Sequence, residues 1–395
     1  MIIVTLLAGL LAAVLLLPVI SDLVSLARLA AGFRPRPSTP RPIGQLPRLL
    51  FLVPAHDEER MIESCVRSLL DLRYPAECFD VLVVADNCTD RTADLARAAG
   101  ARCLERRDPA SPGKPRALAW ALTHVRLDEL DAVIIIDADT VVDPGFGVAL
   151  AGIGSPIADR IFQAYNDVRN PGDTLLTRMA TVLAAANYRF AYALKRKAGL
   201  NAPLSCGMCL GAKVLVAHGW RAFTIAEDVE LYARYTAQGV SIESLPEAHL
   251  YAQEAASLEQ SSTQRLRWTA GKLTVLVSHI GGLIASRKIG LAQKLDALAE
   301  LTLPGPVVHL GLVIVAAALT AILRPPGSDW LLLALAASVV RPALYTVAGL
   351  TVQREPVRAV MAFAFLPLYL VWRLGAVVAA LGQVGDKPWV RTARD

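Results

Sequence analysis

Residues 49–59 read LLFLVPAHDEE, an apolar run of strand-forming side chains that ends in polar and acidic residues. The same pattern returns at 80–87 (DVLVVADN) and at 132–139 (AVIIIDAD), with helix-like segments between the runs. Continuous apolar runs separated by helical stretches are typical of parallel strands covered on both faces. The sequence therefore predicts an α/β domain with a Rossmann-like, mostly parallel sheet. Ligands of such sheets bind at the carboxyl ends of the strands.

The remaining segments of this domain follow from the same periodicity and from capping residues. A helix over 227–237 should end at Gly239, which suits a left-handed C-terminal cap. The other expected elements are helices near 58–71, 89–99, 114–125 and 175–198, a strand at 101–105, and a Gly-rich strand and turn leading into a short helix over 206–218.

The chain is more apolar than a soluble protein of its length. Of 395 residues, 54% are hydrophobic and 19% are charged, against about 45–50% and about 25% in ordinary globular chains. The excess lies in four runs, at 2–20, 302–323, 330–352 and 357–382. These numbers exclude a disordered chain, a collagen-like chain and a purely soluble enzyme. They predict an α-helical transmembrane bundle beside a water-exposed domain.

Domain limits follow from these composition changes. We expect an N-terminal transmembrane helix, a stiff Pro/Arg-rich linker, an α/β domain, an interfacial amphipathic helix, about three C-terminal transmembrane helices and a basic tail. Their predicted ranges are 1–22, 23–47, 48–271, 272–300, 301–383 and 384–395.

Charge placement predicts the orientation in the membrane. Five arginines follow the first apolar run within residues 28–48 and none precedes it, which places the N-terminus outside and the α/β domain in the cytosol. A cleaved signal peptide is disfavoured, because no basic leader or small-residue cleavage site is present. The three positive charges of the tail favour the cytosol, whereas four spans would place it outside. The number of C-terminal spans therefore stays open. We predict an integral protein of the cell inner or plasma membrane.

The basic residues and cysteines point to few further partners. The basic flank of the first span can attract anionic membrane lipids, and nothing indicates a nucleic-acid module. All six cysteines fall in the predicted cytosolic part, where thiols stay reduced. Cys206 and Cys209 have CxxC spacing, but no second pair lies nearby to complete a zinc site, so packing is the favoured interpretation.

Acidic residues at three strand ends predict a nucleotide and metal site. Asp137 and Asp139 are two residues apart, so in extended backbone their carboxylates would project to one side. Such hard oxygen ligands suit Mg²⁺ or Mn²⁺. Asp86 ends the neighbouring strand, and Lys114 after Gly113 offers a cation at a helix start. The spacings of a P-loop and of a dinucleotide fingerprint are absent.

Two further motifs lie downstream. Glu227 and Asp228 begin a helix, where acids can serve either as caps or in chemistry. Gln264, Arg267 and Trp268 stand at i, i+3 and i+4, so they share one helical face. An amide, a guanidinium and an indole suit a diphosphate beside a sugar. An interfacial Arg-Trp anchor is the alternative, but it does not account for the glutamine.

The ordered set of motifs resembles the membrane-bound glycosyltransferases of family 2, which have a GT-A fold and include cellulose, chitin and hyaluronan synthases and ceramide glucosyltransferases. The resemblance covers about residues 49–272, and the Q-x-x-R-W element after D-x-D and E-D is its most specific part. The family's usual threonine before Glu227 is Ala226 here, and its common asparagine is Asp57. The motifs are Pro54–Glu59, Val84–Asn87, Gly113–Lys114, Asp137–Asp139, Ala226–Asp228 and Gln264–Trp268.

This resemblance implies roles for individual residues. Asp228 would be the general base, and Asp137 and Asp139 would bind Mg²⁺ or Mn²⁺ on the donor diphosphate. The residues implied to bind the nucleotide-sugar are Pro54, His56, Glu58, Asp86, Lys114, Asp137, Glu227, Gln264, Arg267 and Trp268.

The implied reaction is a single displacement that inverts the anomeric centre, so that an α-linked UDP-sugar yields a β-glycoside. The acceptor would be a lipid or a growing glycan, and short-polymer or exopolysaccharide synthesis stays open, as does oligomerisation. A polymer channel needs more spans with a polar lining than this chain offers, and His309, Arg341 and Arg373 are the main polar residues of its spans. A transporter subunit that only binds a nucleotide is the alternative from another class; release of UDP or GDP from a nucleotide-sugar would discriminate.

Overall fold

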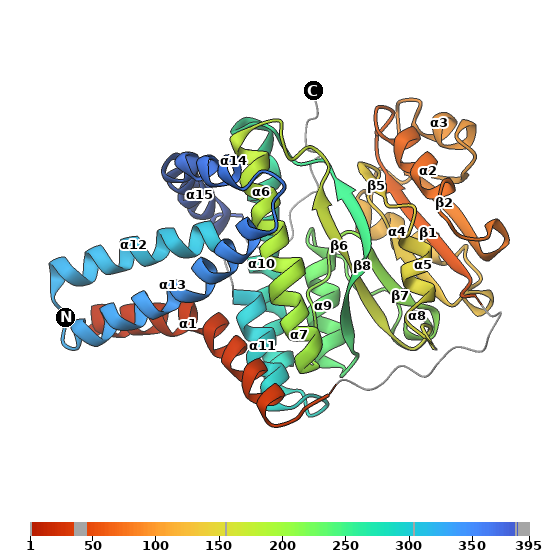
Figure 1. The fold of residues 1–395 in the computed structure, drawn as a ribbon. Coiled ribbons are helices and arrows are strands. Elements are labelled where there is room, and N and C mark those ends of the chain that lie inside the picture. Colours follow the sequence, from red (N-terminus) through yellow and green to blue (C-terminus); the bar gives the residue numbers. More distant parts are fainter. Residues whose placement is uncertain (1, 35–45, 155, 303–304, 384, 386–395) are drawn as a thin grey trace.

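The computed structural model describes residues 2–34, 46–154, 156–302, 305–383 and 385. Its centre is an eight-stranded sheet in the order β3-β2-β1-β4-β7-β6-β8-β5 (Figure 1). Strands β3, β2, β1 and β4 pair parallel to one another, as do β6 and β8. Strand β7 pairs antiparallel with β4 and β6, and β5 pairs antiparallel with β8. The predicted mostly parallel sheet is confirmed. The strands are β1 (Leu49–Ala55), β2 (Phe79–Asp86), β3 (Arg102–Arg106), β4 (Ala132–Ile135), β5 (Thr140–Val142), β6 (Ile161–Val168), β7 (Met208–Gly211) and β8 (Ile242–Ala252).

Strand β1 shows why the apolar runs carry no alternation. All seven of its residues are buried, because both faces of the sheet are covered. Phe51 and Val53 pack in a cluster with Ile62 of α2, whereas Leu50 and Leu52 belong to the cluster on the opposite face. Burying such side chains fully contributes about 1.5–3 kcal/mol each. The polar residues at the ends of these strands are therefore held in place by a tightly packed sheet.

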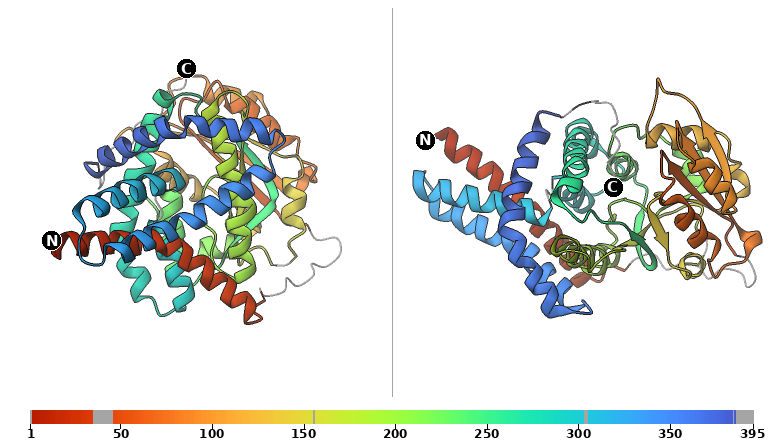
Figure 2. Two further views of the ribbon diagram at one scale, coloured as in Figure 1. Left: turned by 60° about the vertical axis from the view of Figure 1, so that its left-hand side comes forward. Right: turned by 90° about the horizontal axis from the view of Figure 1, so that it is seen from above.

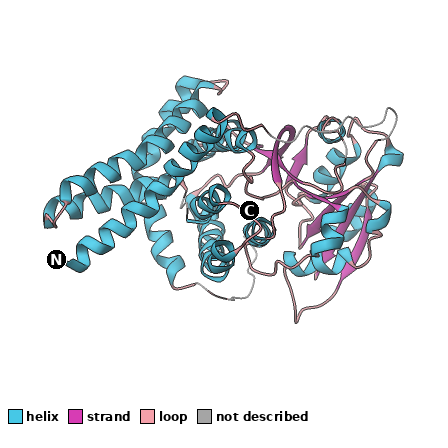
Figure 3. Ribbon diagram, turned by 90° about the horizontal axis from the view of Figure 1, so that it is seen from below, coloured by secondary structure: helices cyan, strands magenta, loops and turns pink. Residues whose placement is uncertain are grey.

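Helices of this domain pack against the sheet, and the long helices of the molecule lie together away from the strands (Figure 3). Helix α9 has the predicted bounds, and Gly239 after it has φ +79°. The predicted helix at 175–198 is α6 and α7 joined by a π-helical turn, η3. The helices are α2 (Ile62–Leu70), α3 (Thr92–Ala98), α4 (Lys114–Leu122), α5 (Phe146–Ala151), α6 (Leu175–Ala185), α7 (Tyr192–Ala198), α8 (Ala212–His218) and α9 (Glu227–Ala237), with the short turns η1 (Ala76–Cys78), η2 (Leu127–Glu129) and η3 (Ala186–Ala191).

Helices α10 (Leu258–Ala285) and α11 (Leu291–Thr302) correct the predicted interfacial segment. The predicted boundary between 271 and 272 falls inside α10, and the single helix expected at 272–300 is divided in two. Their inner faces pack in one cluster with α9, through Val275 and Ala297 among others. At the break, the hydroxyl of Ser286, the residue after α10, donates to the backbone oxygen of Ala237 at the end of α9. This packing against the α/β domain is not visible in hydrophobic periodicity.

Four helical segments of the described residues are long and apolar enough to cross a membrane: Thr5–Ala30, Pro306–Leu323, Ser328–Thr351 and Pro356–Leu381. They lie together on the side of the molecule away from strands β1–β3 (Figure 2). The corresponding elements are α1 (Ile2–Ala30), α12 (Pro306–Leu323), α13 (Ser328–Thr351), α14 (Pro356–Ala362), η4 (Phe363–Phe365) and α15 (Leu366–Leu381).

Helix α1 continues beyond the limit of 22 that the sequence predicts for the first span. Its last turns pack on the α/β side of the molecule, where Ser21 donates to the Asp296 carboxylate and Arg28 donates to the backbone oxygen of Ala198. The linker predicted at 23–47 is therefore helical up to Ala30. Residues 35–45 of that linker, and residues 384 and 386–395 of the predicted basic tail, lie outside the described residues.

Candidate active site

A cavity of about 620 Å³ lies at the carboxyl ends of β1, β2 and β4 and reaches α6, α9, α10 and the candidate membrane helices. All residues predicted for the site line it, although the first and the last of them, Pro54 and Trp268, are more than 200 positions apart. They are Pro54, His56, Glu58, Asp86, Lys114, Asp137, Asp139, Glu227, Asp228, Gln264, Arg267 and Trp268.

Lys114 ties two of the motifs together. Its ammonium lies 2.7 Å from the Asp137 carboxylate and 2.7 Å from that of Glu227. Burial alone would lower the pKa of Lys114, but these two carboxylates raise it well above its usual range. The lysine therefore stays charged at the cavity wall.

Asp86 is held by a partner that the sequence motifs did not include. The Arg106 guanidinium at the end of β3 donates to it over 2.6 Å, and the backbone N–H of Gly113 donates over 3.1 Å. Gly113 has φ +114°, a conformation that favours glycine, so this backbone contact depends on its identity. His56 donates from Nδ1 to the Asp86 backbone oxygen, 2.6 Å away. Arg106 could have been predicted from the sequence, because it ends the strand that follows the strand of Asp86 in the chain.

The D-x-D segment differs from the expected geometry. Strand β4 ends at Ile135, and residues 137–140 form a turn in which the backbone N–H of Thr140 donates to the Asp137 oxygen. The expectation of extended backbone was wrong, because the chain must reverse here to enter β5. Both Asp137 and Asp139 nevertheless line the cavity and are only partly buried. Two carboxylates open toward one space form a donor set that fits Mg²⁺ or Mn²⁺.

Asp228 begins α9 beside this group. Burial, with the neighbouring Glu227 charge, raises the pKa of the Asp228 carboxyl to about 7, while Lys114 and a hydrogen bond from the Val229 backbone oppose the shift. A carboxyl group whose pKa lies near neutrality is suited to accept a proton from a hydroxyl. The helix-cap alternative is weaker, because within the described residues the Asp228 side chain accepts a hydrogen bond from the adjacent Val229 backbone N–H and from no N–H farther into the helix.

The inner face of α10 forms the opposite wall. Gln264, Arg267 and Trp268 all line the cavity, and the Trp268 side chain is 43% exposed. Lys272, one turn beyond Trp268, also lines it. Helical spacing could have identified this lysine, but the predicted domain boundary separated it from the motif. Burial lowers the pKa of Lys272, and the Glu300 charge opposes that shift.

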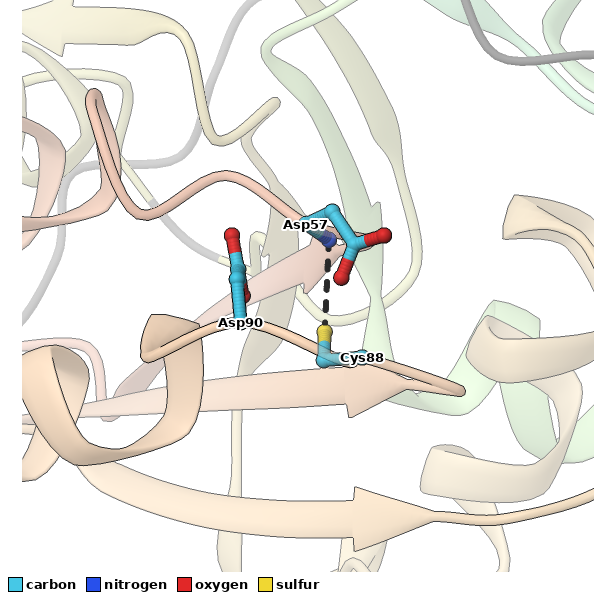
Figure 4. Close-up of side chains that lie close together, drawn as sticks. All are labelled: Asp57, Cys88 and Asp90. Atoms are coloured by element: carbon cyan, nitrogen blue, oxygen red, sulfur yellow. Dashed lines mark hydrogen bonds between the residues drawn. The ribbon is translucent and has the colours of Figure 1, made fainter.

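A second group of potential ligands lies outside this cavity. Asp57, Cys88 and Asp90 bring their side chains together near the ends of β1 and β2 (Figure 4). Their contacts serve the loops: Asp57 accepts from the Thr89 N–H over 2.7 Å, and Asp90 accepts from the Thr92 N–H over 2.9 Å. Asp57 has φ +52°, which aspartate tolerates better than most residues, as asparagine does. We therefore infer that these three side chains stabilise the loops after β1 and β2.

Cys206 and Cys209 are buried and not bonded to each other. The Cys206 thiol accepts a hydrogen bond from the backbone N–H of Asp137, 3.3 Å away, directly behind the D-x-D turn. Both thiols thus lie inside the protein, as the packing interpretation expects.

Comparison with known proteins matches this chain to glycosyltransferases. It is 25% identical over 253 residues to the "Probable glycosyltransferase YdaM" of Bacillus subtilis, covering 60% of this chain and 58% of that protein. It is 24% identical over 271 residues to the "Beta-monoglucosyldiacylglycerol synthase" of Trichormus variabilis, covering 67% and 57%. It is 22% identical over 263 residues to "Glucomannan 4-beta-mannosyltransferase 7" of Arabidopsis thaliana, covering 63% and 47%. The chain thus spans about half of the length of these relatives.

A solved structure shares the fold across almost the whole chain. The mannosyltransferase PcManGT from Pyrobaculum calidifontis, in complex with GDP-Man and Mn²⁺, superposes with a TM-score of 0.59 at 19% identity, covering 96% of this chain and 98% of that one. A family model described as "Glycosyltransferase like family 2" matches residues 47–271, which is more than half of this chain and contains every predicted site residue. The chain therefore belongs to glycosyltransferase-like family 2.

Proposed function

We propose that the protein is a membrane-embedded, inverting glycosyltransferase that moves a sugar from a nucleotide-sugar, with UDP-sugars as the first choice, to a lipid acceptor. One observation carries the proposal: a single cavity contains the acidic strand ends, Asp228 and the Gln264–Trp268 face, and continues between candidate membrane helices. The relatives named for glycolipid and glucomannan synthesis support the reaction class. Following the positive-inside rule, we assign the catalytic domain to the cytosol.

The donor would lie along the strand ends. Asp86, held by Arg106, contacts the nucleoside, and Lys114 lies beside the phosphates with its charge already balanced by Asp137 and Glu227. When bound by Asp137 and Asp139, Mg²⁺ or Mn²⁺ supplies positive charge to the departing diphosphate. Arg267 adds a guanidinium from the opposite wall. These roles make the nucleoside diphosphate a better leaving group.

Asp228 would accept the proton of the acceptor hydroxyl. Its pKa of about 7 keeps a substantial unprotonated fraction at neutral pH and gives it more basicity than an ordinary aspartate. The hydroxyl oxygen bonds to the anomeric carbon as the bond from that carbon to the diphosphate oxygen breaks. One base and one displacement invert the anomeric centre, so an α-linked donor gives a β-glycoside. A double displacement would instead require a carboxylate nucleophile on the opposite face.

A lipid acceptor is favoured over a polymer by the walls of the cavity. Toward the candidate membrane helices they become apolar, with Leu176, Met179, Val307 and Tyr369 among the lining residues. A growing polysaccharide would need polar and aromatic partners along a path. Formation of a ladder of products longer than one added sugar would favour the polymer alternative.

The test is turnover by the purified full chain in lipid vesicles with Mn²⁺ and a panel of UDP- and GDP-sugars. We expect release of the nucleoside diphosphate and a β-linked product by NMR. Asp228→Asn should lower kcat at least about a hundredfold, as loss of a general base does. Asp159→Asn removes a partly exposed carboxylate that pairs with Lys213 away from the cavity, and should behave as the unaltered protein. Unchanged turnover in Asp228→Asn, or an α-linked product, would refute the mechanism.

A further inference from the structure

The part of the cavity next to the candidate membrane helices has walls suited to an acyl chain. Leu176 and Met179 of α6, Val307 of α12 and Tyr369 of α15 form one apolar cluster, and all four line the cavity. Leu183, one turn beyond Met179, extends the same wall. These side chains offer no hydrogen bonds except the tyrosine hydroxyl. A soluble sugar would lose its hydrogen bonds to water here without gaining others, whereas a hydrocarbon chain has no such hydrogen bonds to lose.

Two arginines interrupt this apolar region, Arg265 on α10 and Arg373 on α15, and both line the cavity. Among the described residues, neither Nη1 of Arg373 nor Nε of Arg265 has a hydrogen-bond partner, although both atoms are buried. Burying a guanidinium N–H without an acceptor is costly. The two side chains also line the same cavity, and like charges in one cavity repel each other. An anion between them would relieve both costs.

One carboxylate, that of Glu254, is ion-paired with either of these two arginines among the described residues. Arg265 pairs with Glu254 through Nη2 and lies over the Trp268 ring, 4.8 Å from its centre. Arg373 has no carboxylate in the salt bridges of the described chain. Two guanidinium groups thus face one carboxylate. The planar guanidinium matches the oxygens of a phosphate and is the preferred side chain for binding it.

We propose that Arg265 and Arg373 bind the phosphate of an anionic phospholipid, whose acyl chains lie on the apolar wall and whose headgroup hydroxyl is the sugar acceptor. This rests on the proposed function and names its acceptor class. A hydroxyl is assigned as the nucleophile, rather than a phosphate oxygen, because Asp228 is placed as a base. The hydroxyl oxygen forms the glycosidic bond, its proton passes to Asp228, and the nucleoside diphosphate leaves with the electron pair of the broken bond.

The spacing along α10 fits such a headgroup. Arg265 and Lys272 are seven residues apart, which corresponds to about 10 Å along a helix. Gly271, next to Lys272, lies against Ala226, two residues before Asp228, and Lys272 and Asp228 line the same cavity. The phosphate position and the base are therefore at opposite ends of this stretch of the cavity. A polyol headgroup with its phosphate at the arginines can extend a hydroxyl toward Asp228.

The first experiment compares acceptors with the full chain and Mn²⁺ in phosphatidylcholine vesicles. We expect phosphatidylglycerol to be glycosylated, and phosphatidic acid, which has the phosphate but no headgroup hydroxyl, to inhibit competitively. Neutral diacylglycerol and soluble glycerol 3-phosphate should each be at least tenfold poorer in kcat/KM, because each lacks one half of the recognition. Equal use of either one would overturn the inference. No release of nucleoside diphosphate with any donor and acceptor would instead contradict the proposed function.

The second experiment tests Arg373 itself. Arg373→Gln should raise the KM for phosphatidylglycerol about tenfold or more, the factor expected for one lost charged contact, with a smaller change in kcat. Arg373→Lys should fall between the two, because lysine keeps the charge but not the planar pair of donors. Arg358→Gln removes an exposed arginine from neighbouring α14 and is the matched control, expected to leave both constants unchanged.

Thermal unfolding separates binding from support of the fold. Since Arg373 Nη1 is buried without an acceptor among the described residues, Arg373→Gln should not lower Tm. An unchanged acceptor KM in Arg373→Gln, or a loss of Tm that accounts for the lower activity, would refute the role of this residue.

Discussion

Replacing Gly271 by alanine should disturb the site from behind, because α10 passes very close to Ile225 and Ala226, which directly precede Glu227 and Asp228 at the start of α9. A Cβ atom built on Gly271 would lie 2.8 Å from the Ala226 Cβ and 2.8 Å from a methyl group of Ile225, and 3.3 Å from the Ala226 backbone nitrogen. Contacts this short force one of the elements to move. The methyl group of Ala226 cannot rotate away, so the backbone before the catalytic pair must shift.

Two opposing effects set the magnitude. In an exposed helix interior, glycine to alanine stabilises by about 1 kcal/mol. Overpacking a close-packed contact costs about 1–3 kcal/mol. Gly271→Ala should therefore lower stability by up to about 2 kcal/mol. Because a displacement of about 1 Å at a reacting group can cost about a hundredfold in rate, we expect kcat to fall at least tenfold.

Gly282→Ala is the matched control in the same helix, since nothing lies within 4 Å of a Cβ there. It should raise stability by up to about 1 kcal/mol and leave kcat unchanged. Thermal unfolding and donor turnover of both variants, measured in the same vesicles, provide the comparison. If Gly271→Ala is as stable and as active as Gly282→Ala, the close approach of α10 to Ile225 and Ala226 is wrong.

Three further outcomes follow from the site. Because Asp228 must be unprotonated to accept a proton, kcat/KM should be retained above its pKa of about 7 and fall tenfold per pH unit well below it; a flat profile from pH 5 to 8 would contradict this assignment. Arg106→Gln leaves the Asp86 carboxylate buried without its partner and should lower the free energy of unfolding by about 3–5 kcal/mol. The control Arg102→Gln removes an exposed pair with Asp80 and should change the free energy of unfolding by less than about 1 kcal/mol. Equal effects of the two variants in urea unfolding would count against the buried pair. Removing divalent metal with EDTA should abolish turnover and Mn²⁺ should restore it, with Asp139→Ala needing more Mn²⁺ for half-maximal rate; activity that persists in EDTA would refute the metal role.

Local sequence patterns were sufficient to predict an element where its bounds depend on residues close to it in the chain. The bounds of β1 and α9 follow from an apolar run and from a helix start and stop, and the structure has both at the predicted positions. Patterns failed where distant packing decides. Helix α1 continues to Ala30 because Ser21 finds a partner on α11 and Arg28 finds one at the last residue of α7. Helix α10 crosses the expected boundary because its inner face is covered by α9.

The amino-acid sequence by itself determined the class of this protein: apolar runs that end in acidic residues make parallel strands with polar carboxyl ends, and four long apolar segments make candidate spans. Only the tertiary structure decided which charges meet. Lys114 bridges Asp137 and Glu227, Arg106 holds Asp86, and Arg373 reaches the cavity from the last long helix. The reason is physical: strand and helix periodicity acts over a few residues, whereas an ion pair depends on how distant elements pack, which no local pattern encodes.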